Sequence, residues 1–496
     1  MHSLYNCSMK KRILFVSSEV RPFAMTGGLG DVLGVLPRII AAFGHDVRVV
    51  MPLYRCVPRA QLEDLHISLG VPTGVGERWC GVRRALLPHS EVPVYFIEHD
   101  ALFDRDGLYG TSDGAYGDNL FRFTVLSRGA LQLCKALSWY PEIIHANDWQ
   151  TGMLPGYLNT VERHSPLGRA ACVFTIHNLG YQGRFPADSF GVTGLPWELY
   201  TFLDYEYWDS VNLLKGAMKQ ATVITTVSPT YAREIQTPLF GEGLDGVLRE
   251  RSNVLYGILN GIDEQEWNPA TDTYIDAPFS ADDLTGKALC KQALQQELGL
   301  PLLSDTPLVG MITRFAWQKG IDVLAEAMPR ILQLPLQFVL VGSGESWAEH
   351  YFSTLQHSYP WNYRCIVQFN NRLAHRVEAG ADLYVMPSRY EPCGLNQMYS
   401  LRYGTLPIVR ATGGLEDTVD HYNPNTGDGT GFKFWDLTAD AIVGTVSWAV
   451  DAFRYRPDHI RLMRARAMRR DFCWSNVAVR YLEVYEQATA LRLMSL

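Results

Sequence analysis

Long apolar runs are missing from this chain of 496 residues, and so is a strong excess of charge of either sign. No segment approaches the roughly 20 apolar residues that cross a membrane. The formal net charge of -8 gives no general attraction to nucleic acid or to an anionic membrane surface. We therefore expect no nucleic-acid or membrane partner, and a phosphate-bearing ligand would have to be held by a local group of cations.

A regular cysteine spacing is missing as well. The nine cysteines are scattered and include no CxxC pair, which argues against a disulfide framework and against structural zinc. The first residues lack an apolar segment followed by a small-residue cleavage site. We expect a cytoplasmic protein with no metal site and no targeting peptide, in which residues 1–8 form a loose extension.

What the sequence contains is an alternation of short apolar runs with helical patterns, in a chain too long for one comfortable core. Apolar strands joined by helices predict an α/β fold with parallel sheets. The predicted strands are residues 11–18, 47–52, 92–97, 143–145, 171–177 and 221–227, and, after the pattern restarts, 308–313, 338–341, 365–368, 383–386 and 406–409, with helices at 32–43 and 321–332.

Two similar halves are the simplest organisation for this pattern. A stretch rich in Asp, Thr, Pro and Ala separates them. The sequence Thr26-Gly-Gly-Leu-Gly-Asp-Val32 also resembles Thr412-Gly-Gly-Leu-Glu-Asp-Thr418, an echo that chance and a shared origin explain equally well. We predict a first domain over 9–266, a linker over 267–287, a second domain over 288–474 and a final helical segment over 475–496, with ligands in a cleft between the halves.

The first chemical motif is the glycine turn after the first predicted strand. Gly27 and Gly28 let the chain come close to a ligand, and the helix that follows offers free N–H groups that suit a phosphate. The spacing is not that of a dinucleotide-binding loop, and a plain tight turn explains it equally well.

A second motif places cations just after a predicted strand. Arg314 and Lys319 lie in TRFAWQKG, where an Arg fork and a Lys point charge could stabilise a departing diphosphate. The alternative is a pair of solvated surface cations, which contribute little. The position at a strand's carboxyl end favours function.

A third motif is SRYEPCGL, which follows the predicted strand 383–386. Pro392 suits the first turn of a helix, so we expect Glu391 beside free helix N–H groups. A carboxylate there could accept hydrogen bonds from a sugar hydroxyl or stabilise an oxocarbenium-like centre. Its alternative role is that of an ordinary anion at a helix start.

Two more strand ends carry polar groups. His177 and Asn178 end the strand 171–177, and Asp148 and Trp149 follow the strand 143–145. A carboxylate beside a flat ring suits carbohydrate, although a lone His is more often structural and Trp149 could equally belong to the core.

Together these stretches resemble one family. The chain looks like the bacterial glycogen synthases and plant starch synthases, retaining glucosyltransferases of the ADP-glucose type with the GT-B fold, from residue 11 to the C-terminus. That fold is two Rossmann-like parallel-sheet domains facing each other across a cleft. The matching stretches are HANDWQTG (145–152), FTIHNLGYQG (174–183), TTVSPTYAREI (225–235), GILNGID (257–263), SRYEPCGLNQ (388–397) and RYGTLPIVRATGGLEDTV (402–419).

The resemblance implies roles for individual residues. It makes Glu391, His177, Arg314 and Lys319 the catalytic group, with both cations on the diphosphate. The residues that it places on the donor are Gly27, Gly28, Asp31, Asn178, Asn260, Cys393, Gly394 and Leu395. Those that it places on the acceptor side are Glu19, Tyr116 and Asp148.

The resemblance also implies a reaction. Glucose would pass from ADP-glucose to the non-reducing 4-hydroxyl of an α-1,4-glucan such as glycogen, with retention of configuration and with no metal and no cofactor. The cleft would have to close during turnover, and a last helix over about 475–488 would cross back onto the first domain.

Other activities share this architecture. A UDP-glucose-dependent synthase differs only in its nucleotide contacts, and a glucan phosphorylase would need a lysine for pyridoxal phosphate, for which no motif is found. A non-catalytic glycan-binding relative is the third alternative, because Met25 stands where the family usually has Lys. We hypothesise that Arg21, at the other end of the same loop, partly replaces that lysine; the alternative is that Arg21 is a solvated surface residue and Met25 simply packs.

Overall fold

The structure is a computed structural model that describes residues 10–112, 114–368 and 370–496. The predicted extension over 1–8 and the predicted domain start at residue 9 lie outside this range. By its internal contacts the chain forms two compact units, and each is described by itself. The first unit comprises the chain through Val227, Ala232–Ile258 and Trp474–Leu496, and the second comprises Ser228–Tyr231 and Leu259–Cys473.

A nine-stranded sheet forms the centre of the first unit, in the order β13-β12-β9-β8-β1-β2-β5-β4-β3. Its strands from β13 to β5 are parallel and largely buried, which explains their continuous apolar runs. The strands are β1 (Arg12–Val16), β2 (Asp46–Pro52), β3 (Glu63–Thr73), β4 (Gly76–Leu86), β5 (Pro93–Glu98), β8 (Ile143–Asn147), β9 (Ala171–Ile176), β12 (Val223–Thr226) and β13 (Leu255–Gly257).

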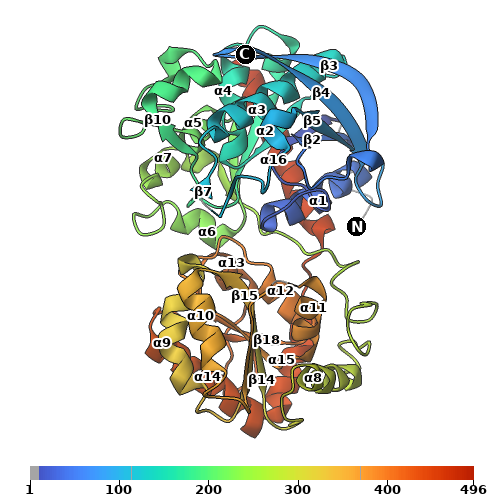
Figure 1. Ribbon diagram of the computed structural model, residues 1–496, viewed down its shortest axis with the longest axis vertical. Helices are drawn as coiled ribbons and strands as arrows, with labels where there is room; N and C mark the ends of the chain where they lie inside the picture. Colours follow the sequence, from blue (N-terminus) through green and yellow to red (C-terminus); the bar gives the residue numbers. More distant parts are fainter. Residues whose placement is uncertain (1–9, 113, 369) are drawn as a thin grey trace. The chain divides into compact units, whose positions relative to one another are not determined.

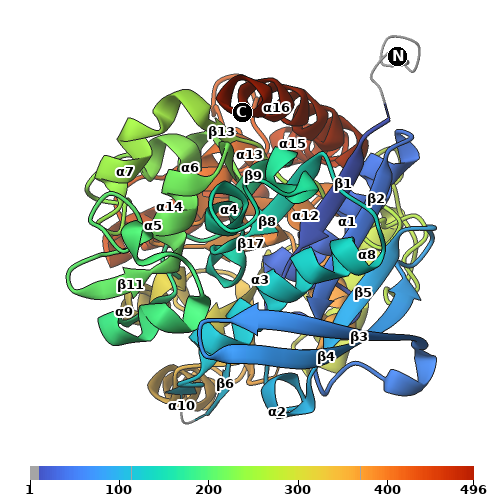
Figure 2. The same ribbon diagram turned by 90° about the horizontal axis from the view of Figure 1, so that it is seen from above.

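The long β3–β4 hairpin was not expected from the sequence. It extends the sheet by antiparallel pairing with β5, and it stands out as two long ribbons in Figure 2. This edge of the sheet is therefore antiparallel, and no strand was predicted there from the sequence. The strands alternate buried and exposed side chains and carry many charges, so their sequence lacks the apolar run by which the other strands are found.

Helices and short pairs complete the first unit. The helices are α1 (Gly28–Ala42), α2 (Asp100–Phe103), α3 (Asn119–Ala136), α4 (Leu154–Asn159), α5 (Leu213–Gln220), α6 (Pro229–Glu234), α7 (Asp245–Glu250) and α16 (Trp474–Ser495), where α6 begins among residues of the second unit. The small strand pairs are β6 (Gly110–Thr111) with β7 (Gly114–Ala115) and β10 (Arg184–Pro186) with β11 (Ser210–Asn212).

The C-terminal helix α16 belongs to the first unit by its contacts with α1, β8 and β9. Its Tyr485 hydroxyl lies 2.7 Å from Nδ1 of the buried His145. Glu486 forms an ion pair of 3.1 Å with Lys11, the residue before β1. The last helix of the chain therefore packs against the sheet that contains the first strand.

The second unit is built on a six-stranded parallel sheet in the order β16-β15-β14-β17-β18-β19. Figure 1 shows α9, α10 and α14 on one side of this sheet and α8, α11, α12 and α15 on the other, as in a doubly wound fold. The strands are β14 (Leu308–Phe315), β15 (Gln337–Gly344), β16 (Tyr363–Ile366), β17 (Leu383–Met386), β18 (Leu406–Arg410) and β19 (Phe432–Phe434). The helices are α8 (Thr285–Glu297), α9 (Ile321–Ile331), α10 (Ser346–Leu355), α11 (Asn371–Gly380), α12 (Asn396–Arg402), α13 (Gly413–Thr418), α14 (Ala439–Tyr455) and α15 (Pro457–Met468).

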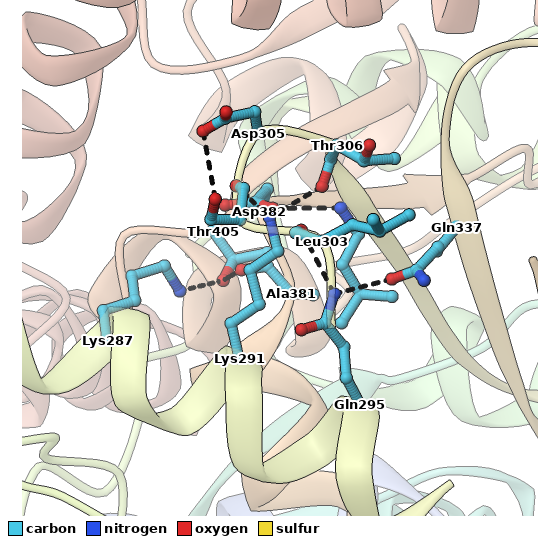
Figure 3. A network of polar contacts seen from close by, with 12 residues as sticks. Lys287, Lys291, Gln295, Leu303, Asp305, Thr306, Gln337, Ala381, Asp382 and Thr405 are labelled. Carbon is cyan, nitrogen blue, oxygen red and sulfur yellow. Dashed lines mark hydrogen bonds and ion pairs between the residues drawn. The ribbon is translucent and has the colours of Figure 1, made fainter. Parts of the chain in front are cut away.

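Helix α8 is fixed to this sheet by two buried lysines (Figure 3). Lys287 Nζ donates to the Ala379 carbonyl at 2.9 Å and to Thr405 Oγ1 at 2.7 Å. Lys291 Nζ lies 2.7 Å from an oxygen of the Asp382 carboxylate. Burial lowers the pKa of Lys287 to about 7, so Lys287 holds the helix by directed hydrogen bonds, whereas Lys291 holds it by an ion pair.

No helix in the described part of the chain is both long enough and apolar enough to span a bilayer. The α/β class with parallel sheets that the sequence predicts is confirmed in each unit.

Candidate active site

Three neighbouring strands of the second unit end beside one another and carry the predicted site residues. Lys319 follows β14, Glu391 follows β17 and Gly413 follows β18. The carboxyl ends of parallel strands lie at one edge of a sheet, where open α/β sheets bind their ligands.

Glu391 and Lys319 form an ion pair at this edge. Lys319 Nζ donates to Glu391 Oε2 at 2.6 Å, and Ser388 Oγ donates to the same oxygen at 3.0 Å. The Glu391 side chain is almost fully buried, whereas Lys319 keeps a fifth of its side chain exposed. Among the described residues no donor reaches Glu391 Oε1, so this oxygen is available to a ligand.

Arg314 is the last residue but one of β14, five positions before Lys319. Arg314 is exposed, and its guanidinium has no partner anywhere in the described ranges. A planar group with five free donors suits a phosphate or carboxylate ligand.

The helix predicted to begin at Pro392 begins instead at Asn396. Glu391 therefore does not stand at a helix start, and that expectation is wrong. The residues between form an irregular loop, and we call residues 391–395 the EPCGL loop. Gly394 has φ 70°, a left-handed conformation that favours glycine and that interrupts the helix.

Four consecutive carbonyl oxygens of the EPCGL loop are each held by a donor. The Gly414 N–H donates to the Glu391 carbonyl at 3.0 Å, and Ser228 Oγ donates to the Pro392 carbonyl at 2.7 Å. Gln397 Nε2 donates to the carbonyls of the next two residues at 3.0 Å each. The loop is thus fixed from one side.

Because these carbonyls are fixed by hydrogen bonds, the directions of the N–H groups in the same peptides are fixed as well. Each peptide is planar and trans, so the N–H of a residue points away from the carbonyl of the residue before it. The N–H groups of Cys393, Gly394 and Leu395 meet no acceptor in the part of the chain that the structure describes. They form a row of three donors, suited to the oxygens of a sugar or a phosphate.

Gly413 and Gly414, the glycines of the second Thr-Gly-Gly-Leu copy, pack directly against the backbone of this loop. A Cβ at Gly413 would lie 1.9 Å from the Glu391 carbonyl oxygen, and one at Gly414 would lie 2.0 Å from the Cys393 carbonyl oxygen. Helix α13 begins at Gly413, as α1 begins at Gly28, so both copies of the Thr-Gly-Gly-Leu echo open a helix. Their further roles differ, because the second copy packs on the EPCGL loop.

Asn260 lies against the same loop. It is buried, and its backbone N–H donates to the Cys393 sulfur; burial raises the pKa of that thiol to about 12. The Asn260 Oδ1 atom is buried and meets no donor among the described residues. A hydrogen-bonding group without a partner at such a place is available to a ligand.

In the first unit the glycine turn is held by Glu19. Its carboxylate accepts the Thr26 N–H at 2.6 Å, the Gly27 N–H at 3.3 Å and the Tyr109 hydroxyl at 2.6 Å. Nothing lies within 4 Å of where a Gly27 side chain would begin, so the turn leaves open space there. Glu19 is 4% exposed, which makes it a support of the turn rather than a surface acid.

Asp148 connects two strand ends of the first unit. Its Oδ1 accepts the His177 N–H at 2.7 Å, and Asn178 donates a second backbone hydrogen bond to the carboxylate. Burial raises the pKa of Asp148 to about 7, and the nearby Glu19 charge adds to the rise. Its φ of 56° is uncommon for a non-glycine residue, and such strain is concentrated at functional sites.

His177 is neutral at physiological pH because burial lowers its pKa to about 3. Its Nε2 lies 2.9 Å from Asn147 Oδ1, while Asn147 Nδ2 donates to two carbonyls. An amide oxygen only accepts, so Nε2 carries the hydrogen and Nδ1 is left as an acceptor. His177 is therefore built to make hydrogen bonds, not to carry charge.

Of the other predicted residues of the first unit, Asp31 lies in the first turn of α1 and Tyr116 in the loop before α3. Asp31 forms an ion pair of 3.1 Å with Arg21, and Met25 is 41% exposed. The Tyr116 hydroxyl donates to the Asp106 carbonyl, and its backbone N–H donates to the Tyr109 carbonyl at 2.9 Å.

Several supporting residues were missed by the sequence prediction. Ser228, Ser388 and Gln397 lie in the motifs quoted above but received no role. Their function is to hold the EPCGL loop or its carboxylate, and of the three only Ser228 is distant from that loop in sequence, 164 positions from Pro392. The alternation of polar and apolar residues carries no information about which carbonyl or carboxylate a polar side chain will hold.

Comparisons with known proteins agree with this geometry. Residues 12–250 match the family model of the starch synthase catalytic domain, and residues 296–452 match that of the glycosyl transferases group 1. Glycogen synthase 1 of Geobacter metallireducens is 51% identical over 98% of both chains, and the glycogen synthase of Treponema denticola is 45% identical over 96% of this chain and 98% of that protein.

Comparison with solved structures also indicates similarity to the starch synthases. The catalytic domain of starch synthase IV from Arabidopsis thaliana, solved with ADP and acarbose, superposes with a TM-score of 0.90 at 33% identity, over 97% of this chain and 100% of that one. Sucrose-phosphate synthase from Thermosynechococcus elongatus, at 19% identity and a TM-score of 0.57, shares the fold. The chain therefore belongs to the family of bacterial glycogen synthases and plant starch synthases, and it is a glycosyltransferase of the GT-B fold.

Proposed function

We propose that this enzyme transfers glucose from ADP-glucose to the non-reducing 4-hydroxyl of an α-1,4-glucan, with retention of configuration. The relatives named glycogen synthases support the glucan acceptor. The starch synthase solved with ADP and acarbose supports the adenine nucleotide.

One observation of the second unit carries the proposal most directly. A buried carboxylate, its lysine partner and three unoccupied N–H donors lie at one strand edge, with Arg314 exposed beside them. A diphosphate that gains charge as it departs needs such cations, and a sugar needs such directed donors.

The proposed step follows from these groups. Arg314 and Lys319 draw charge onto the diphosphate, the bond from C1 to its oxygen breaks, and the anomeric carbon becomes oxocarbenium-like. The acceptor oxygen forms the new bond on the face that the leaving group vacates, and its proton passes to the departing diphosphate. Glu391 holds Lys319 through Oε2 and offers Oε1 to the sugar. No metal or cofactor is part of this proposal, because the chain's own cations supply the charge.

The first unit takes the remaining roles in this proposal. Gly27 and Gly28 leave room for the donor, and Asp31 lies on the donor side in the first turn of α1. His177 and Asn178 contact the transferred glucose, with Asp148 holding both backbones. Glu19, Tyr116 and Asp148 lie on the acceptor side. The proposed reaction requires the two units to close on the substrates during turnover.

A cytoplasmic location is part of the same proposal. Eight cysteines, from Cys56 to Cys473, are free thiols in the described part of the chain, which suits a reducing compartment.

Purified protein incubated with glycogen and either ADP-glucose or UDP-glucose tests the proposal, with diphosphate release and glucose incorporation as readouts. We expect ADP release that depends on glycogen, and α-1,4-linked product. Faster release from UDP-glucose would favour the UDP-dependent alternative. Glycogen binding without release from either donor would favour the non-catalytic one.

A further inference from the structure

Four residues of the motif TTVSPTYAREI belong by their contacts to the second unit, although their neighbours on both sides belong to the first. They are Ser228–Tyr231, at the start of α6. We call them the SPTY segment. Within the second unit this segment contacts the EPCGL loop and helix α13.

The SPTY segment holds the EPCGL loop through one hydroxyl. Ser228 Oγ accepts the Tyr231 N–H at 3.1 Å, as an N-cap does, and donates to the Pro392 carbonyl at 2.7 Å. Ser228 is fully buried, so its hydroxyl has no water to replace either partner.

A carboxylate on α13 fixes the same segment. Asp417 Oδ2 accepts the Thr230 N–H at 2.8 Å, and Asp417 Oδ1 accepts the Thr230 hydroxyl at 2.6 Å. Two hydrogen bonds from one residue to one carboxylate set both the position and the rotation of the segment. Asp417 lies on the helix whose first glycines support the EPCGL loop, so one helix holds the loop directly and through the SPTY segment.

We propose that Asp417 is a positioning residue for glucosyl transfer, acting through Thr230 and Ser228 on the EPCGL loop. Ser228 holds the Pro392 carbonyl, and the planar peptide then aims the Cys393 N–H to the opposite side. That N–H is the first of the three free donors, so loss of Asp417 turns the row away from the donor sugar. This inference rests on the proposed function, because it takes the row to contact the transferred glucose.

The matched variants are Asp417→Ala and Asp417→Asn. Asn keeps an acceptor for the Thr230 N–H and can donate its amide to the Thr230 hydroxyl, so it preserves both bonds. Glu416→Ala is the control, since that neighbouring carboxylate on α13 pairs with Lys433 at 2.9 Å and does not touch the SPTY segment.

We expect Asp417→Ala to lower kcat with ADP-glucose about 10- to 100-fold, in the range of a lost positioning interaction, while KM for glycogen stays within about twofold. Asp417→Asn and Glu416→Ala should keep kcat within about threefold of wild type. Circular dichroism and thermal unfolding of each variant establish the folded fraction, to which kcat is normalised.

A double-mutant cycle separates positioning from general weakening. If Asp417 acts through Ser228, the double variant Asp417→Ala with Ser228→Ala loses no more turnover than the worse single variant, whereas independent effects would multiply. Unchanged kcat in folded Asp417→Ala, or multiplied losses in the double variant, would overturn the inference. Absence of transfer by the wild type would instead refute the proposed function.

Discussion

At the scale of single residues, burial decides which groups of this protein carry charge. His177 is held neutral, and burial raises the pKa of Asp148 to about 7 so that it is partly protonated at neutral pH, whereas Glu391 stays beside a lysine. The first two therefore act by hydrogen bonding, and the charge that the proposed reaction needs is concentrated on Arg314, Lys319 and Glu391.

Asp148 gives a prediction for stability against pH. Its pKa rises from an ordinary 3.8 to about 7 in the fold, so between these values the unfolded chain releases a proton that the fold retains. Its stabilising contribution is complete below the lower value and is lost as pH rises through about 7, by up to about 4 kcal/mol at roughly 1.4 kcal/mol per pKa unit. The free energy of unfolding of wild type minus that of Asp148→Asn, from denaturant titrations at several pH values, should fall over this window. A difference between the two unfolding free energies that does not change with pH would show that the pKa of Asp148 is not raised in the fold.

Arg314 gives a prediction for turnover without a change in stability. Because its guanidinium has no partner in the described ranges, Arg314→Ala should change the unfolding free energy by less than about 0.5 kcal/mol. It should lower kcat with ADP-glucose about 100-fold if the cation stabilises the departing diphosphate. Arg461→Ala, which removes an exposed guanidinium paired with Asp458 on α15, is the control and should leave kcat unchanged. A loss of glycogen affinity at normal kcat would assign Arg314 to the acceptor instead.

Sequence analysis found the charged residues of the site, because cations and carboxylates after apolar strands are visible in the sequence. It could not find the interactions between them. The pairing of Lys319 with Glu391 joins residues 72 positions apart, and the partner of Pro392 is Ser228, 164 positions away. Such contacts depend on how strands are ordered in the sheet, which a local pattern does not specify.

At the scale of elements, strands buried on both faces were predicted well and the polar hairpin was not. The strand β17 has the predicted bounds, since its apolar residues are limited by polar ones. The hairpin β3–β4 is half exposed, and its charged residues resemble those of a loop. The start of α12 was misplaced because Pro392 fits a helix start, while the left-handed Gly394 and the held carbonyls keep the loop irregular.

The contact of α13 with the EPCGL loop gives a prediction at this scale. In Gly414→Ala the new methyl group would meet the Cys393 carbonyl oxygen at 2.0 Å, so the loop must move. We expect a loss of about 1–3 kcal/mol in unfolding free energy and at least about a tenfold loss of kcat. Gly444→Ala in α14 is the control, because nothing lies within 4 Å of its added methyl group and alanine favours a helix interior by about 0.5–1 kcal/mol. Equal activity of the two variants would show that the loop tolerates displacement.

At the scale of the whole molecule, the chain forms two α/β units of which neither is one continuous segment. The SPTY segment belongs to the second unit and α16 to the first. The segments that enter and leave the second unit are joined by a bridge between Ile262 and Cys473. The sequence predicted a boundary after residue 266, whereas the contacts divide the chain after Ile258, because the residues that follow already pack against the second unit.

The most direct test of the account is the turnover of Glu391→Gln with ADP-glucose and glycogen, measured in protein shown to be folded. Glutamine keeps the size of the side chain and removes the charge that holds Lys319. The account predicts a loss of kcat of about 100- to 1000-fold, as for other losses of preorganised electrostatic stabilisation. Turnover close to that of the wild type would contradict it, because the ion pair at the end of β14 and β17 would then have no part in glucosyl transfer.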